Sequence, residues 1–158
     1  MIRITDQYFW NFVFTLFFGA LVVMGAIILE TEGYRPLSEL ELFDFVLISL
    51  ATFRLIRLFV YDAITKFFRE QFYDATTVGK NIVLEKPAKG PRRTIADLLS
   101  CPWCFGVWAA AMVTFFYVLT PYAYYIVFFL AIGAVATFFQ LLANLIGWKA
   151  EEVKQKVK

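Results

Sequence analysis

The chain has 158 residues, of which 61% are hydrophobic and 20% aromatic, and its formal net charge is only +2. An ordinary globular domain carries about 45–50% apolar residues, so this clustered excess indicates that the protein is solvated by lipid. The absence of histidine excludes His-ligated metal sites, His general bases and the usual Ser-His or Cys-His nucleophile pairs.

Two segments in the first half of the chain are predicted to cross a membrane. Residues 8–29 contain no charged side chain and lack the basic start and small-residue cleavage site of a signal peptide. Residues 42–61 form the second, in which Arg54 and Arg57 lie close enough to one end to reach lipid headgroups. A helix crosses about 30 Å of hydrocarbon in about 20 residues, so both segments are long enough.

The second half contains 51 consecutive uncharged residues, 98–148. As one helix this run would be about 77 Å long, far more than the thickness of a bilayer. Pro121 cannot donate a backbone hydrogen bond and biases Thr120 away from helix, so two spans are predicted, 102–119 and 122–148. The predicted fold is an all-α polytopic membrane bundle with four transmembrane helices in a single domain, residues 1–158.

Residues 62–101, between the second and third spans, are predicted to form a cytoplasmic loop. The first part, 62–73, has apolar residues on one face and charged residues on the other, with Asp62 as the predicted cap. This pattern is typical of a short amphipathic helix lying in the membrane interface. Residues 74–93 show no sustained periodicity and are predicted to be partly ordered at most.

The distribution of Lys and Arg predicts the orientation. With both termini in the cytoplasm, 12 flanking basic residues lie inside and one, Arg35, lies outside; the opposite topology reverses this ratio. The positive-inside rule therefore predicts a multi-pass protein of the bacterial inner membrane with cytoplasmic termini, in which residues 149–158 are a cytoplasmic tail.

Both cysteines lie at the start of the third span, as the Cys-x-x-Cys pair Cys101 and Cys104. Thr94-x-x-Asp97 resembles a capping box that opens a short helix toward them. Cys101 is predicted to cap the span, with Pro102 in the first helical position. Aligned amide dipoles at such a helix start favour the thiolate.

Three interpretations of Cys101 and Cys104 remain open. Packing cysteines are favoured, because cytoplasmic disulfides are usually transient and a single Cys-x-x-Cys is weakly specific. A membrane thiol–disulfide oxidoreductase would use the pair catalytically. A metal site would need completion by Asp97 or a second subunit, since zinc usually takes four ligands, and no metal is predicted.

Arg54, Arg57 and Tyr61 fall on one face of the second span. They are candidates for contact with an anionic lipid headgroup or a carboxylate such as Asp97; the alternative is simple snorkelling of both arginines. In the third span, Trp103 is predicted to be an interfacial anchor, and small residues including Gly106 are predicted to allow close helix packing.

Two strings carry a family resemblance: R-L-x-R-L-x-x-Y-D at residues 54–62 and C-x-W-C-x-G-x-W at residues 101–108. Together they resemble a domain-of-unknown-function family of small bacterial and phage membrane proteins, some of them sporulation-associated. The resemblance implies signature positions without an assigned activity. These positions are Arg54, Arg57, Tyr61, Asp62, Cys101, Trp103, Cys104, Gly106 and Trp108.

These observations predict a small, non-enzymatic membrane protein that binds or organises a partner, either a second copy or another membrane protein, without a cofactor. The alternatives are the thiol oxidoreductase and a phage holin-like pore former. The basic loop lacks interleaved aromatic residues and a recognisable fold, so nucleic acid is not an expected partner.

Overall fold

The computed structural model describes residues 6–78 and 81–156. Arg3, Lys80 and Lys158, which contribute to the predicted charge bias, lie outside the described residues. The described part is mostly helical, which confirms the helical class. Three of its helices are long and apolar enough to cross a membrane. They are α1 (Asp6–Glu32), α5 (Pro102–Leu119) and α6 (Ala123–Lys156).

The second predicted span is helical throughout, but not as one α-helix. Helix α2 (Leu42–Ile56) continues into a π-helical turn, η2 (Arg57–Tyr61). The α-helical part has 15 residues, too few to cross alone. A capping box begins α2. The Glu41 side chain accepts a hydrogen bond from the backbone N–H of Asp44, and the Asp44 side chain accepts one from the backbone N–H of Glu41.

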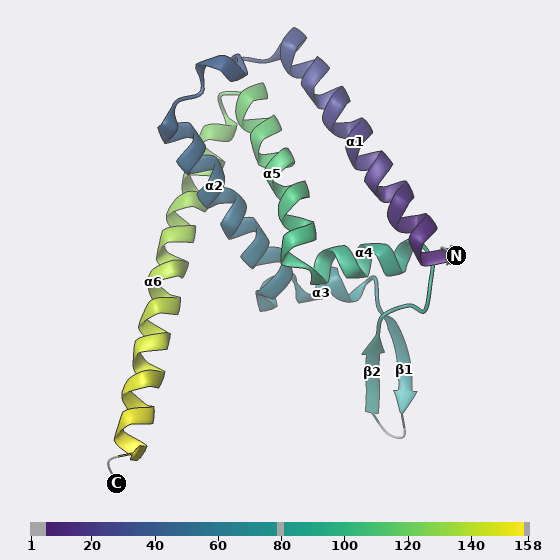
Figure 1. Ribbon diagram of the computed structural model, residues 1–158, viewed down its shortest axis with the longest axis vertical. Coiled ribbons are helices and arrows are strands. Elements are labelled where there is room, and N and C mark those ends of the chain that lie inside the picture. Colours follow the sequence, from purple (N-terminus) through teal and green to yellow (C-terminus); the bar gives the residue numbers. More distant parts are fainter. Residues whose placement is uncertain (1–5, 79–80, 157–158) are drawn as a thin grey trace, which may run out of the picture.

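The uncharged run folds at the predicted place. Helix α5 begins after Cys101 and ends at Leu119, so it covers the same residues as the third predicted span. Helix α6 is longer than the predicted span, because the charged tail continues the helix to Lys156. Its 34 residues correspond to about 51 Å, so it extends well beyond the other helices (Figure 1).

The prediction of a partly ordered loop is wrong for residues 74–78 and 81–85. They form an antiparallel hairpin of β1 (Asp74–Val78) and β2 (Asn81–Glu85), with Val78 opposite Asn81. The fold is therefore helical with one small sheet rather than all-α. Threonine and aliphatic β-branched residues on both sides of Gly79 favour strands. Helical periodicity does not detect this signal, so the hairpin was not predicted.

The predicted amphipathic helix is shorter than residues 62–73. It consists of a 3₁₀ turn, η3 (Ala63–Thr65), followed by α3 (Lys66–Glu70). Asp62 occupies the N-cap position of η3, as predicted, but its side chain makes no capping hydrogen bond. The carboxylate instead pairs with Arg54.

The predicted capping box at Thr94 is also wrong. Helix α4 (Pro91–Ser100) begins earlier, after Gly90, whose φ of 93° suits glycine. Pro91 occupies the first helical position, where its missing N–H costs nothing. Thr94 and Asp97 consequently lie inside the helix, and their side chains are available for contacts with other segments.

The hydrophobic core lies where α2 packs against α5 and α6. Its buried residues come from all three helices, with fully buried Ala51 allowing close approach. They are Leu47, Ile48, Ala51, Val113, Tyr117, Val118, Val127 and Ala131. Helix α1 is peripheral and has no buried residue.

The long helices define two ends of the molecule (Figure 1). We call the end where α1 begins, η2 ends and α5 begins the thiol end; it also carries α3, α4 and the hairpin. The opposite end, the turn end, contains the short helix η1 (Leu37–Glu39) and the turn between α5 and α6.

Candidate functional site

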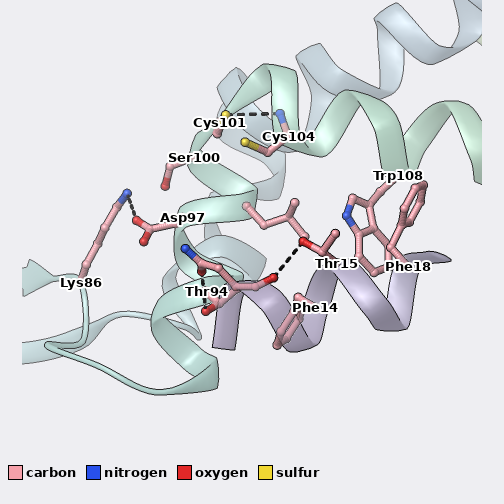
Figure 2. Close-up of a pocket in the computed structure, with 12 residues that line it drawn as sticks. Phe14, Thr15, Phe18, Lys86, Thr94, Asp97, Ser100, Cys101, Cys104 and Trp108 are labelled. Carbon is pink, nitrogen blue, oxygen red and sulfur yellow. Dashed lines mark hydrogen bonds and ion pairs between the residues drawn. The ribbon is translucent and has the colours of Figure 1, made fainter. Parts of the chain in front are cut away.

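A cavity of about 480 Å³ lies at the thiol end between α1, α4 and the start of α5 (Figure 2). Both cysteines line it, together with a polar group and an aromatic group. The lining residues are Asn11, Phe14, Thr15, Phe18, Lys86, Thr94, Asp97, Leu98, Ser100, Cys101, Cys104 and Trp108. This volume lies within the range of small-molecule sites in proteins.

The Cys pair adopts the predicted helix-start geometry. Cys101 caps α5, and its sulfur accepts a 3.2 Å hydrogen bond from the backbone N–H of Cys104, with Pro102 in the first turn. Both cysteines are free, and Cys104 is the more exposed. Hydrogen bonding from the Cys104 side chain, and then from its backbone N–H, holds the pKa of Cys101 below its ordinary value. The arrangement favours a thiolate at Cys101.

Asp97 forms an ion cluster at the polar side of the cavity. Its two carboxylate oxygens bind Lys86 at 2.8 Å and Arg93 at 2.9 Å. Burial acts to raise the pKa of Asp97, but hydrogen bonds from Lys86 and Arg93 outweigh it and leave the pKa below its ordinary value. Asp97 is thus occupied by cations, and no group of three or more His, Cys, Asp or Glu within 6–78 and 81–156 could hold a metal ion.

Helix α1 forms the far wall of the cavity through a few side-chain contacts. Gln7 Nε2 donates to Thr94 Oγ1 at 2.8 Å, and Thr94 Oγ1 donates to Asn11 Oδ1 at 3.2 Å. Phe18 lies against Trp108, with 4.7 Å between ring centroids. These contacts attach an otherwise unburied helix to both α4 and α5.

A second polar group surrounds η2. Arg54 pairs with Asp62 at 3.0 Å, while Arg57 lies over the Tyr61 ring, 4.9 Å from its centroid. Arg69 donates to the backbone carbonyls of Phe59 and Asp62. Arg69 thereby satisfies carbonyls that the end of the long helix leaves without helical partners.

The structure separates the predicted site residues into these two groups. Cys101, Cys104 and Asp97 share the cavity, whereas Arg54 lies outside it and pairs with Asp62 rather than with Asp97. The two signature strings meet where Gly106 lies against Ile56, since a Cβ on Gly106 would be 3.1 Å from Ile56 Cδ1. Trp103 is 86% exposed and does not line the cavity.

Sequence reasoning did not identify several residues of the cavity. Thr94 and the α1 residues meet through contacts between segments more than 80 positions apart, such as Gln7 with Thr94, and Lys86 reaches the cavity through Asp97, 11 positions away. The only local signal was Asn11 and Thr15, two polar residues one helical turn apart within an uncharged span.

A third polar cluster, at the turn end, was also missed. Buried Asp44 accepts a hydrogen bond from the Tyr117 hydroxyl at 2.5 Å and pairs with Arg35 at 3.0 Å. Arg35 also donates to the backbone carbonyl of Glu39. This cluster connects the loop after α1 to α2 and α5.

The fold and the cavity together define a helical protein with apolar helices of membrane-spanning length and a thiol pair at one end of its bundle. Residues 47–143 match the model of a protein family of unknown function, DUF1360. The chain belongs to this family, which confirms the resemblance given by the two signature strings.

Two relatives come from Bacillus subtilis (strain 168). The sporulation protein YjcA is 35% identical over 107 residues, which cover 63% of this chain and 89% of YjcA. The UPF0713 protein YngL is 31% identical over 98 residues, which cover 61% of this chain and 75% of YngL. No solved structure matches this chain. Helix α1 lies outside the family match.

Proposed function

We propose that the chain is a four-span protein of the bacterial inner membrane with both termini in the cytoplasm. The continuous helix of α2 and η2 supplies the fourth span, and successive long helices run in opposite directions (Figure 1). The charge bias supports a cytoplasmic thiol end. Exposed Ile64 and Phe67, at 74% and 69%, support contact of η3 and α3 with the interface.

Maleimide labelling of Cys104 in intact cells and in lysates tests this topology. We expect a membrane-impermeant maleimide to label Cys104 only after lysis. Labelling of Cys104 in intact cells would contradict the proposed orientation.

We infer that one molecular role of the chain is the binding of a protein partner at the thiol end, a role that needs no catalysis. The observation that carries this proposal is the use of signature residues as structural supports: Arg54 binds Asp62, and Gly106 allows α5 to approach Ile56. They fix a layer of α3, α4 and the hairpin onto the bundle. The hairpin stands away from the helices (Figure 1), where an unpaired strand edge can receive another chain.

Site-specific photocrosslinking in cells tests partner binding. A photoreactive residue at Leu84, 41% exposed on β2, is compared with one at Leu142, 42% exposed on α6. We expect a discrete protein adduct from Leu84 and lipid adducts from Leu142. The absence of a protein adduct at Leu84 would count against the proposal. The name of YjcA makes sporulation the first process in which to look for the partner.

A second candidate function is thiol–disulfide chemistry at Cys101 and Cys104. One observation favours it: the Cys101 sulfur caps α5 and accepts a hydrogen bond from Cys104 while both sulfurs face a cavity. Replacing both cysteines by serine tests this function. A phenotype equal to that of the unmodified protein would exclude it and leave the partner-binding role.

A further inference from the structure

The cavity differs from an ordinary packing gap because its two sides have opposite character. Lys86, Asp97 and Ser100 lie on one side, and Phe14, Phe18 and Trp108 on the other (Figure 2). The cavity also lies at one end of the apolar spans, where an amphiphile has its polar head near water and its tail in lipid. A ligand with a ring-shaped head and an apolar tail fits this distribution.

Two residues that line the cavity, Asn11 and Trp108, carry N–H donors that have no acceptor among the residues that the structure describes. Asn11 lines the cavity, and its Oδ1 accepts from both Gln7 and Thr94, while its amide N–H groups donate to none of the residues that the structure describes. The indole N–H of Trp108 points toward the same space (Figure 2) and has no acceptor among the residues that the structure describes. Such a pair of donors suits a ligand whose head carries acceptors only, such as a ring with carbonyl oxygens.

The cavity also contains a two-electron reductant. Cys101 caps α5 and Cys104 lies in its first turn, where the Cys104 side chain is a hydrogen-bond partner of Cys101. Two sulfurs so placed can join in a disulfide without movement of the helix axis. A ring with two carbonyl groups accepts two electrons, so the donors, the aromatic wall and the dithiol all favour the same class of ligand.

We propose that this cavity binds a membrane quinone and that the Cys101/Cys104 dithiol reduces it to the quinol. The proposal rests on the second candidate function, thiol chemistry. In the step, an S–S bond forms between the two sulfurs, which lose two electrons. The quinone takes up these electrons and two protons, one from the Cys104 thiol and one from water at the polar side, and leaves as quinol. Exchange with a cytoplasmic dithiol returns the disulfide to the dithiol.

Helix α1 adds the ring-binding wall to the family fold. Asn11, Phe14, Thr15 and Phe18 all come from α1, which the family match at 47–143 does not include. The thiols and Trp108 lie inside the match. We therefore assign quinone binding to this chain's own combination of α1 with the family's thiol turn.

The proposal is tested by mixing the protein with a quinone in the absence of oxygen. The reduced full-length protein is placed in lipid nanodiscs, and the quinone is a fully ring-substituted benzoquinone that carries a decyl tail. Full substitution of the ring prevents permanent addition of a thiol. We expect one disulfide per quinol formed, measured by mass spectrometry of alkylated protein and by quinone absorbance. The Cys101→Ser variant is expected to form no quinol.

Two pairs of variants test whether the cavity is the site. Trp108→Phe removes the indole donor, and Trp103→Phe is its control outside the cavity. Thr15→Phe fills the cavity, and Thr31→Phe is its control, because both threonines bond to carbonyls of their own helix. We expect Trp108→Phe and Thr15→Phe to slow quinol formation about fivefold to tenfold, with both controls unchanged. Equal rates in all four variants would overturn the assignment to the cavity.

A small thiol oxidant, diamide, separates the two levels of the proposal. If diamide forms the Cys101–Cys104 disulfide and the quinone does not, quinone reduction is excluded and the thiol function survives. If neither reagent forms the disulfide, both the quinone reduction and the thiol function fail.

Discussion

The Arg54 guanidinium binds the Asp62 carboxylate with 3.0 Å between Nη1 and Oδ2, across the π-helical turn that completes the second long helix. Both residues belong to one signature string, and the pair lies beside α6, since a Cβ on Gly133 would be 3.6 Å from Arg54 Cδ. The side chains are 25% and 27% exposed. The pair therefore joins the end of α2 to the start of η3 at the thiol end, within a partly desolvated environment.

Asp62→Asn is expected to destabilise the protein by about 1–3 kcal/mol, because the Arg54 charge then lacks its partner. Thermal unfolding in detergent, followed by circular dichroism, measures the loss. When Asp62→Asn is added to Arg54→Met, it should lower the stability by less than Asp62→Asn does alone, since no unpaired charge remains in the double variant. Additive losses would show that the two residues do not interact.

Gly106→Leu is expected to destabilise the bundle by about 1–3 kcal/mol, because a large side chain must displace Ile56 and separate α5 from α2. Gly19→Leu is the matched control: it lies in α1 with nothing within 4 Å of an added Cβ. Both variants are compared by thermal unfolding in the same detergent. A similar loss of stability in both variants would mean that the loss arises from replacing a helical glycine and not from the contact with Ile56.

Tyr117→Phe is expected to destabilise the turn end by about 1–3 kcal/mol, because buried Asp44 loses a hydrogen-bond donor. Tyr125→Phe on α6 is the control, since Tyr125 is 64% exposed. Limited proteolysis of the loop between α1 and α2, together with thermal unfolding, reports the change. Unchanged cleavage and unfolding in Tyr117→Phe would contradict a structural role for this hydrogen bond.

Some local features could be predicted from the sequence, whereas contacts between distant segments could not. The Cys101 cap depends on the next three residues, so spacing alone predicts it, and the Thr120-Pro121 turn follows from the chemistry of proline. Arg54 pairs with Asp62 because a π-helical turn lies between them. Hydrophobic periodicity does not distinguish a π-helical turn from an α-helical one. The α1 wall depends on a Gln7–Thr94 contact across 87 positions, for which no local pattern exists.

The ion cluster at Asp97 predicts a dependence of stability on pH. Since the pKa of Asp97 in the folded protein is below the ordinary value of 3.8, its stabilising contribution is present above pH 3.8 and is lost as the pH falls through the folded value. We expect Asp97→Asn to lower the unfolding temperature at pH 6 and to differ progressively less from the unmodified protein in more acidic solution. The cluster is partly solvent-exposed, so the difference should be small and should decrease with salt.

Glu151→Gln, on the exposed end of α6, is the control for removal of one acidic group. We expect its unfolding temperature to follow that of the unmodified protein at every pH. If Asp97→Asn behaves like Glu151→Gln at pH 6, the contacts of Asp97 with Lys86 and Arg93 do not stabilise the fold.

The hydrogen bonds to the Cys101 sulfur predict its reactivity. Because the pKa of Cys101 lies below the ordinary value of 9.0, its thiolate forms at lower pH than that of an unperturbed thiol, and the thiolate is the reactive form. In Cys104→Ser, a hydroxyl donor remains beside the sulfur, and the alkylation rate of Cys101 should reach half its maximum below pH 9.0. In Cys104→Ala this midpoint should move upward, since only the backbone N–H remains.

The rate of iodoacetamide reaction between pH 5 and pH 10 measures both midpoints, and Cys101→Ser reports Cys104 alone. Equal midpoints in Cys104→Ser and Cys104→Ala would show that the side chain at position 104 does not stabilise the thiolate. Midpoints at or above 9.0 in both variants would further show that the start of α5 gives no such stabilisation. The Cys pair would then be a packing feature, because a thiol that stays protonated at neutral pH reacts slowly with both disulfides and quinones.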